Sequence, residues 1–198
     1  MRLTAIPYLL IAFRLAAGVA VVILALAFGA SARMACAVLL ALGVLSDIFD
    51  GVIARRLGSV TDRLRTYDSR ADVVFWLGVT IAMLVLHPRL VAATWPMVAV
   101  LGAMELTTHA LSYARFGKEA SPHHILSKLF GLALWALFTQ LLLTGAGGWL
   151  LWLVFLVGVA SQIEAFAITL ALPAWRCDVR GLGEALALRR QATAGLSA

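Results

Sequence analysis

The sequence predicts an all-α integral membrane protein: a six-helix bundle with both termini in the cytoplasm and a short amphipathic C-terminal tail. Of its 198 residues, 63% are hydrophobic and 13% charged, and the mean hydropathy is +0.97. An ordinary globular domain is only about half apolar. Six apolar stretches approach the roughly 20 residues that a helix needs to cross the hydrocarbon layer. The cations gather in alternate loops, a pattern typical of membrane proteins.

The six stretches are expected to be helices, because lipid offers backbone groups no hydrogen-bond partner and the stretches are too long and uniformly apolar for barrel strands. The first is too long for a secretion signal, contains Arg14 and lacks an obvious small-residue cleavage site. The predicted spans cover about residues 7–29, 33–54, 69–86, 91–113, 125–144 and 148–172.

Orientation follows from the positions of Lys and Arg, which short cytoplasmic loops retain. Cations are frequent after the second and fourth spans and in the tail, whereas the opposite loops hold only Arg33 and Arg89. Both termini and any soluble-side chemistry are therefore expected on the inner face of the cytoplasmic membrane. The cations on that side are Arg55, Arg56, Arg63, Arg65, Arg115, Lys118, Arg176, Arg180, Arg189 and Arg190.

The chain has no repeat or linker that would divide it, so residues 1–198 are expected to form a single membrane domain, of which about 173–198 is a surface tail. Leucines among arginines in 178–190 suit either a helix lying on the membrane or a solvated amphipathic tail. The net charge of +6 fits topology and attraction to anionic lipid, and nucleic acid is not expected as a partner. Cys36 and Cys177 predict neither a disulfide nor a zinc site.

Four aspartates stand where two apolar helices approach the inner surface. Asp47 and Asp50 lie about 60° apart around the second helix, and Asp68 and Asp72 about 40° apart at the start of the third. Only seventeen residues, 51–67, connect the two pairs. Antiparallel neighbouring helices would therefore bring four carboxylates together just beneath the membrane surface.

Ionised carboxylates in such a place repel one another and lose hydration, so positive charge must offset them. Arg55, Arg56 and Arg70 would do so in a purely structural network. Magnesium or manganese, one ion or two, would do so as well, because both prefer hard oxygen ligands. Two ions would bridge a diphosphate in an in-line displacement. Oxygens satisfied wholly by arginine, with no space for an ion, would contradict the enzymatic interpretation.

This stretch resembles the signature of the CDP-alcohol phosphotransferases, DxxDGxxARx8GxxxDxxxD. Seven of the eight fixed positions match with the spacing intact, and the segment PYLLIAFR at 7–14 looks like the family's N-terminal segment ending in arginine. The matching residues are Asp47, Asp50, Gly51, Ala54, Arg55, Asp68 and Asp72.

The resemblance implies a transferase that displaces CMP from CDP-diacylglycerol, or a related CDP-alcohol, with the hydroxyl of a small alcohol. It makes Asp47, Asp50, Asp68 and Asp72 ligands of one or two Mg²⁺ or Mn²⁺ ions, and it makes Asp72 the general base as well. It assigns Gly51, Ala54, Arg55 and, more weakly, Thr61 to the cytidine diphosphate. It also implies a homodimer.

Leu64 departs from the signature, which has glycine at this position. The family's glycine gives the nucleotide room, so a leucine predicts either a displaced loop or altered nucleotide binding. Leu64→Gly is accordingly expected to tighten CDP-alcohol binding.

The polar stretch 112–131 returns to the inner face, where Lys128 is a candidate for contact with an acceptor phosphate. Relatives that use glycerol 3-phosphate often carry a second lysine after a glycine here, whereas Gly131 is followed by leucine, which weakens the case for a phosphorylated acceptor. His123 and His124 are interpreted as a solvated loop pair or as proton shuttles. Glu105 with His109, and likewise Glu164, are interpreted as buried polar links between helices or as part of an acceptor pocket.

Two other classes of function remain open from the residues alone: a cation transporter and a non-catalytic scaffold. A transporter is expected to place ionisable groups near the midplane, often with broken helices, whereas these cluster at one end. A scaffold would need no cation, so magnesium-dependent release of CMP distinguishes it from an enzyme.

Overall fold

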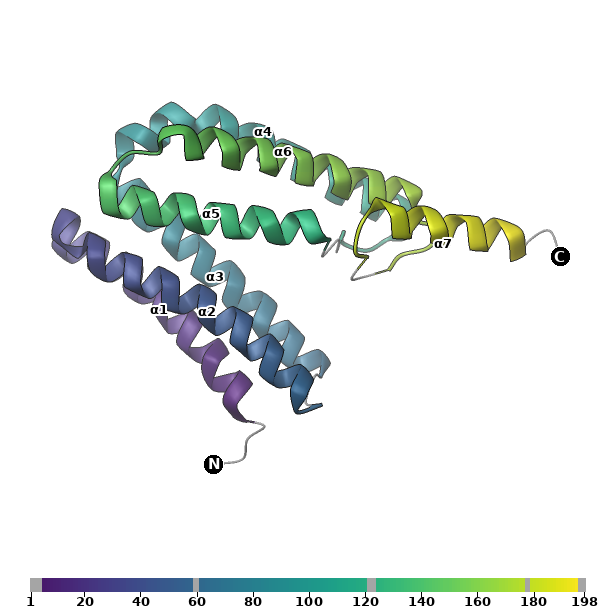
Figure 1. Ribbon diagram of the computed structural model, residues 1–198, viewed down its shortest axis with the longest axis horizontal. Helices are drawn as coiled ribbons and strands as arrows, with labels where there is room; N and C mark the ends of the chain where they lie inside the picture. The colour runs from purple at the N-terminus through teal and green to yellow at the C-terminus, as the bar shows by residue number, and fades with distance from the viewer. Residues whose placement is uncertain (1–4, 59–60, 121–123, 177–178, 196–198) are drawn as a thin grey trace. The chain divides into compact units, whose positions relative to one another are not determined.

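The computed structural model describes residues 5–58, 61–120, 124–176 and 179–195. Within these ranges every regular element is a helix and no strand occurs, as the composition predicts (Figure 1). The elements are α1 (Ile6–Phe28), the short 3₁₀ helix η2 (Gly29–Ala32), α2 (Arg33–Arg56), α3 (Asp62–Leu86), α4 (Pro88–Phe116), α5 (Ile125–Thr144), α6 (Gly148–Ala171) and α7 (Leu182–Gly195).

All six predicted helices are present, with most ends within a few residues of the expected ones. The third differs most, because α3 begins at Asp62 rather than near residue 69. Thr61 explains the early start: its hydroxyl accepts a hydrogen bond from the Leu64 amide (3.2 Å) and so caps the helix. The tail predicted to be amphipathic contains the helix α7.

Four helical stretches among the described residues are long and apolar enough to cross a membrane. The first comprises α1, η2 and α2, of which α1 and α2 pack against each other, and the others are α4, α5 and α6. The apolar part of α3 follows Asp72 and covers about 21 Å, less than the roughly 30 Å hydrocarbon layer. Six crossings and the cytoplasmic position of the termini therefore stay predictions.

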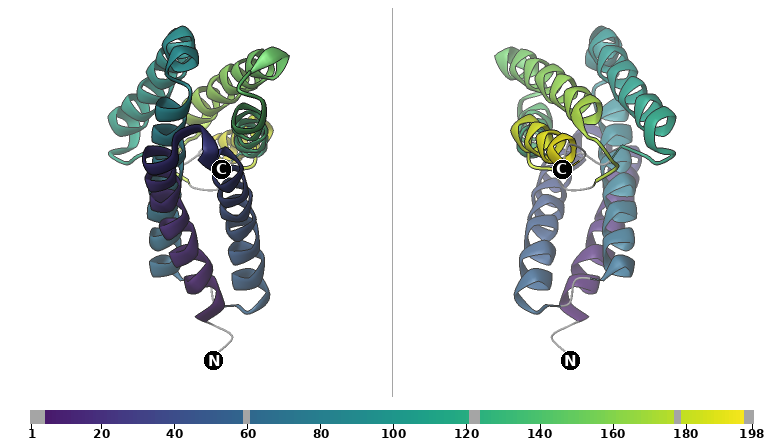
Figure 2. Two further views of the ribbon diagram at one scale, coloured as in Figure 1. Left: turned by 90° about the vertical axis from the view of Figure 1, so that its left-hand side faces the viewer. Right: turned by 90° about the vertical axis from the view of Figure 1, so that its right-hand side faces the viewer.

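The chain divides into two compact units, residues 1–92 with 138–146, and residues 93–137 with 147–198. In the first unit, α1 packs against both α2 and α3 (Figure 2). The helices approach closely at glycines: a Cβ on Gly78 would lie 2.2 Å from the Gly18 carbonyl oxygen, and one on Gly43 would lie 2.3 Å from the Phe75 ring. These contacts fix the separation of the three helices within two turns of the aspartates.

The second unit joins its helices through polar as well as apolar contacts. Arg115 on α4 donates to the carbonyl oxygens of Leu170 (2.7 Å) and Leu172 (3.2 Å), which lack partners within α6. The helix α7 packs against the end of α6 in an apolar cluster that contains Ile168, Val179 and Ala185, each at most 1% exposed. The tail is thus part of the fold of this unit.

Candidate functional site

The four aspartates come together at one end of the first unit. Asp47 and Asp50 lie in the last turns of α2, and Asp68 and Asp72 in the first turns of α3. The short connection between the helices follows from Gly58, whose φ of +60° suits glycine just after a helix end, and from the Thr61 cap. Carboxylates spaced three or four residues apart share a helix face, so both pairs can point toward one place.

A buried arginine from α1 lies at the centre of this cluster. The Arg14 side chain is 0% exposed, and its two terminal nitrogens contact all four carboxylates. Nη1 binds Asp47 and Asp72, and Nη2 lies 2.5 Å from an oxygen of Asp50 and 2.5 Å from one of Asp68. The third nitrogen, Nε, is buried without a partner. Three helices therefore meet through one guanidinium.

Arg14 is the residue that sequence reasoning missed. The signal was present, because a lone arginine inside an apolar stretch needs a partner, and the nearest unpaired anions in the chain were the aspartates. The expected counter-charges, Arg55, Arg56 and Arg70, are instead exposed. In the described part of the chain, none of these three forms an ion pair with the four carboxylates. The carboxylates do form an ion-pair network with an arginine, but that arginine is Arg14.

Arginine does not satisfy the carboxylates wholly. One guanidinium carries a single positive charge, so four ionised aspartates would leave a net charge of −3 at the cluster. Arg14 takes one oxygen from each carboxylate and leaves the other. Three of the side chains are 38–46% exposed, whereas that of Asp50 is 5% exposed. The cluster is closed on the side of Arg14 and open on the other.

The donor set suits a divalent cation. Asp47, Asp50 and Asp68 each offer an oxygen, and these oxygens all lie within 4.8 Å of one another. Carboxylate oxygens are the ligands that Mg²⁺ and Mn²⁺ prefer. The carboxylates already bind one positive charge, that of the Arg14 guanidinium. Their excess negative charge would attract a further cation. These residues therefore fit a divalent cation.

The residues that the signature assigns to the nucleotide lie beside the aspartates on α2 and at the start of α3. Gly51 is half-buried, and a Cβ there would lie 3.2 Å from Nη1 of Arg55, so the missing side chain leaves room for that guanidinium. Arg55 is exposed, Ala54 is buried (3%), and Thr61 is the exposed cap of α3.

Leu64 is a core residue in this fold. It is 6% exposed and packs with Ile11, Ala54 and Ala71, one from each of α1, α2 and α3. The leucine thus packs beside Ala54, one of the residues that the signature assigns to the nucleotide. Both outcomes expected from the departure at this position, a displaced loop and altered nucleotide binding, stay predictions.

The polar residues of the second unit form a separate arrangement. His124 is 1% exposed, so the expectation of a solvated loop histidine is wrong for this residue; His123 lies outside the described residues. The Nε2 atom of His124 lies 3.2 Å from both oxygens of Ser161 and 3.7 Å from Glu164. Glu164 accepts a hydrogen bond from the Leu182 amide (3.3 Å), so it links α6 to α7.

Two further expectations fall in this unit. Glu105 lies 3.3 Å from His109 on the same helix and accepts a hydrogen bond from Gln162 on α6 (2.5 Å), so it links α4 to α6. The expectation that this link is buried is wrong, because the Glu105 side chain is 52% exposed. Lys128 is exposed in the first turn of α5. Its part in acceptor binding stays a prediction.

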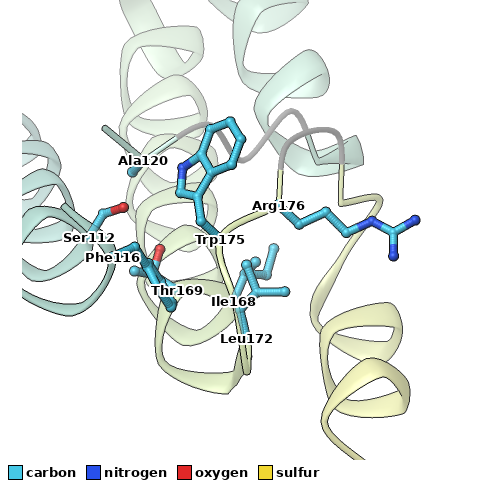
Figure 3. A pocket seen from close by; sticks show the side chains of 8 residues that line it. All are labelled: Ser112, Phe116, Ala120, Ile168, Thr169, Leu172, Trp175 and Arg176. Carbon is cyan, nitrogen blue, oxygen red and sulfur yellow. The ribbon is translucent and has the colours of Figure 1, made fainter. Parts of the chain in front are cut away.

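A shallow pocket lies near the end of α6, with side chains from α4 on one wall (Figure 3). Its polar atoms already have partners: Ser112 donates to the Lys118 carbonyl (2.9 Å), Thr169 to that of Ala165 (2.9 Å) and Trp175 to that of Glu119 (2.8 Å). The Arg176 side chain extends away from the other lining groups. This pocket therefore offers little to a polar ligand, and the aspartate cluster is the candidate site.

Comparison with known proteins agrees with this choice. Residues 4–160, well over half of the chain, match a family model described as CDP-alcohol phosphatidyltransferase, and the match includes all four aspartates and Arg14. Comparison with curated protein sequences and comparison with solved structures each gave no match.

Proposed function

The chain belongs to the CDP-alcohol phosphatidyltransferase family, and from this premise we propose that it transfers the phosphatidyl group of CDP-diacylglycerol, or of a related CDP-linked lipid, to a small alcohol. The observation that carries this proposal is the convergence of four carboxylates on a single positive charge. A structural ion pair needs one anion for one cation. Three surplus carboxylates are a costly arrangement unless a cationic ligand or a metal-bound substrate uses them.

In the proposed reaction, the hydroxyl oxygen of the acceptor attacks the phosphorus that bears the diacylglycerol. The bond from that phosphorus to the bridging oxygen breaks, and CMP leaves with the bonding electron pair. Asp72 takes the proton of the hydroxyl. A carboxylate crowded by three others gains basicity, because each neighbouring negative charge favours its protonated form. The side chain of Asp72 is 38% exposed, so an acceptor can reach it.

Asp47, Asp50, Asp68 and Asp72 would hold one or two Mg²⁺ or Mn²⁺ ions. When bound, such an ion neutralises charge on the diphosphate and on the departing CMP. Gly51, Ala54 and Arg55 would hold the cytidine diphosphate, with the exposed Arg55 fork on a phosphate oxygen pair. Thr61 is a weaker candidate for the same half of the substrate, since its hydroxyl already caps α3.

The acceptor is proposed only as a small alcohol, with Lys128 as a candidate contact for an acceptor phosphate. We place the protein as a homodimer in the cytoplasmic membrane, with its site on the inner face, by the distribution of cations and by resemblance to the family.

One observation favours a second candidate, a family relative that does not catalyse the reaction. Arg14 contacts every carboxylate of the cluster, so the helices can hold together without a metal. In such a protein the cluster would serve assembly alone. Metal dependence of CMP release separates the two candidates, because a scaffold releases no CMP with or without magnesium.

The test uses the purified full chain in liposomes with CDP-diacylglycerol, Mg²⁺ and a panel of phosphorylated and unphosphorylated alcohols. We expect release of CMP together with formation of one new phospholipid, and loss of both when EDTA replaces Mg²⁺. The lipid identifies the acceptor. Absence of CMP release with every alcohol, from protein that remains folded, would favour the scaffold.

A further inference from the structure

We propose that Arg14 is a built-in counter-cation that holds the four aspartates together without metal and competes with the metal for their oxygens. It thereby sets the cation affinity of the site. This inference rests on the proposed function only in assuming that a divalent cation binds the cluster.

The geometry gives Arg14 no other partner. Both of its terminal nitrogens are used by carboxylates from α2 and α3, and its side chain is fully buried. Arginine in this position differs from a surface cation, because its charge lies a hydrogen bond away from every carboxylate of the cluster. Among the described residues, no second cation approaches these four oxygens.

The backbone of Arg14 is fixed while its side chain has alternatives. Gly18, one turn further along α1, is pressed against α3 so closely that a Cβ there would lie 2.7 Å from the Phe75 Cα. Movement of α1 away from α3 would lose this close packing, so when a cation enters from the open side of the cluster we expect the side chain to move rather than the helix. The guanidinium would then give up some of its carboxylate oxygens, or share the carboxylates through their second oxygens.

If Arg14 competes with the metal for the carboxylate oxygens, a result follows that a merely structural role of Arg14 does not predict. A guanidinium and a dication repel each other across a few ångströms, so removal of the guanidinium should strengthen metal binding. Removal should also weaken the metal-free protein, because four carboxylates then face one another without a counter-charge. Metal affinity and metal-free stability thus move in opposite directions. If Arg14 only positioned the aspartates, both would fall.

The experiment measures Mn²⁺ binding by the electron paramagnetic resonance signal of free Mn²⁺, and thermal unfolding in EDTA and in excess Mn²⁺, for the purified full chain. Three variants are compared: Arg14→Gln removes the charge, Arg14→Lys keeps it on a point cation that cannot span four carboxylates, and Arg70→Gln removes an exposed cation that lies between Asp68 and Asp72 in sequence.

For Arg14→Gln we expect Mn²⁺ binding at least about tenfold tighter than in the wild type, a lower melting temperature in EDTA, and recovery of most of that loss in Mn²⁺. Arg14→Lys should lie between this variant and the wild type. Arg70→Gln should change the dissociation constant less than about twofold, because an exposed charge is screened.

Weaker or unchanged Mn²⁺ binding by Arg14→Gln would overturn the inference, as would a variant that does not fold even in Mn²⁺, since metal and arginine would then not be interchangeable. A variant that folds only with Mn²⁺ supports it. The proposed function fails differently: the wild type would release no CMP with any alcohol, although it binds Mn²⁺ and Arg14→Gln binds it more tightly.

Discussion

Two polar clusters in this protein each place at least one acidic side chain beside a buried basic residue, and they differ in their balance of charge. In the first unit, one arginine faces four aspartates. In the second, His124 faces the Ser161 oxygens and Glu164, and Glu164 in turn accepts from a backbone amide of α7. The second cluster has one acidic group, and each of its members has a partner within the same unit.

The difference indicates which cluster binds a ligand. A cluster whose donors and acceptors pair with one another needs nothing further, and its role is to join segments. A cluster with surplus charge and half-exposed oxygens is unstable by itself, and a ligand of opposite charge stabilises it. We therefore expect changes in the first cluster to alter chemistry and metal binding, and changes in the second to alter stability alone.

The largest effect is expected for Asp72→Asn. The amide keeps the shape of the side chain but cannot accept the hydroxyl proton, so CMP release should fall about 100- to 10,000-fold. Thermal unfolding in EDTA should be unchanged or slightly improved, since one surplus charge is removed. Glu184→Gln is the matched control, because it changes an acid to an amide in α7. Wild-type turnover by Asp72→Asn would refute the assignment of the base.

Gly78→Leu should damage both stability and metal binding. The new side chain would begin 2.2 Å from the Gly18 carbonyl oxygen, so α1 and α3 must separate. We expect a loss of about 1–3 kcal/mol or more in the free energy of unfolding, measured by denaturant titration. We also expect weaker Mn²⁺ binding, measured by electron paramagnetic resonance. Gly102→Ala on α4 is the control, since no atom of its own unit lies within 4 Å. It should gain up to about 1 kcal/mol.

Leu64→Gly distinguishes the effect of Leu64 on stability from its effect on nucleotide binding. Loss of the buried side chain should cost about 2–5 kcal/mol as a cavity, with about 1 kcal/mol more for glycine in a helix. If the leucine also narrows the nucleotide site, binding of a CDP-alcohol to the folded fraction should tighten. Unchanged or weaker binding would show that Leu64 does not obstruct the site.

Glu164→Ala tests the second cluster. The change leaves His124 and the Leu182 amide without their acidic partner, so we expect a loss of about 1–3 kcal/mol and faster tryptic cleavage at the exposed Arg180. Mn²⁺ affinity should stay within about twofold of the wild type. Glu164→Gln keeps an acceptor for the amide and should retain most of the stability. A large change in Mn²⁺ affinity would contradict the separation of the two clusters.

The smallest effect concerns His87, between α3 and α4. Burial and the nearby Arg33 lower the pKa of this imidazole below its usual value, and its Nε2 is buried without a partner. As pH falls below about 6.5, the unfolded chain gains a proton that the folded protein resists, so stability falls, by at most about 1.4 kcal/mol per pH unit. Thermal unfolding at several pH values should show a shallower fall for His87→Gln. An identical pH profile would contradict it.

Several features of the fold could be predicted from residues read in order. The lengths of the apolar stretches predict the helices, and the spacing of Asp47, Asp50, Asp68 and Asp72 predicts two shared faces. The aspartate signature indicated the same family whose model matches residues 4–160. His124 was misjudged because a polar residue in a loop is usually solvated, whereas here the imidazole is buried against α6, beside Ser161.

The sequence by itself determined that four carboxylates would stand at one end of two helices, because helical periodicity acts over a few residues and needs no knowledge of neighbours. Only the tertiary structure decided that Arg14 would lie among them and that Leu64 would be buried. Both depend on how closely α1 approaches α2 and α3, and the glycine contacts at Gly18, Gly43 and Gly78 set that distance between residues far apart in the chain.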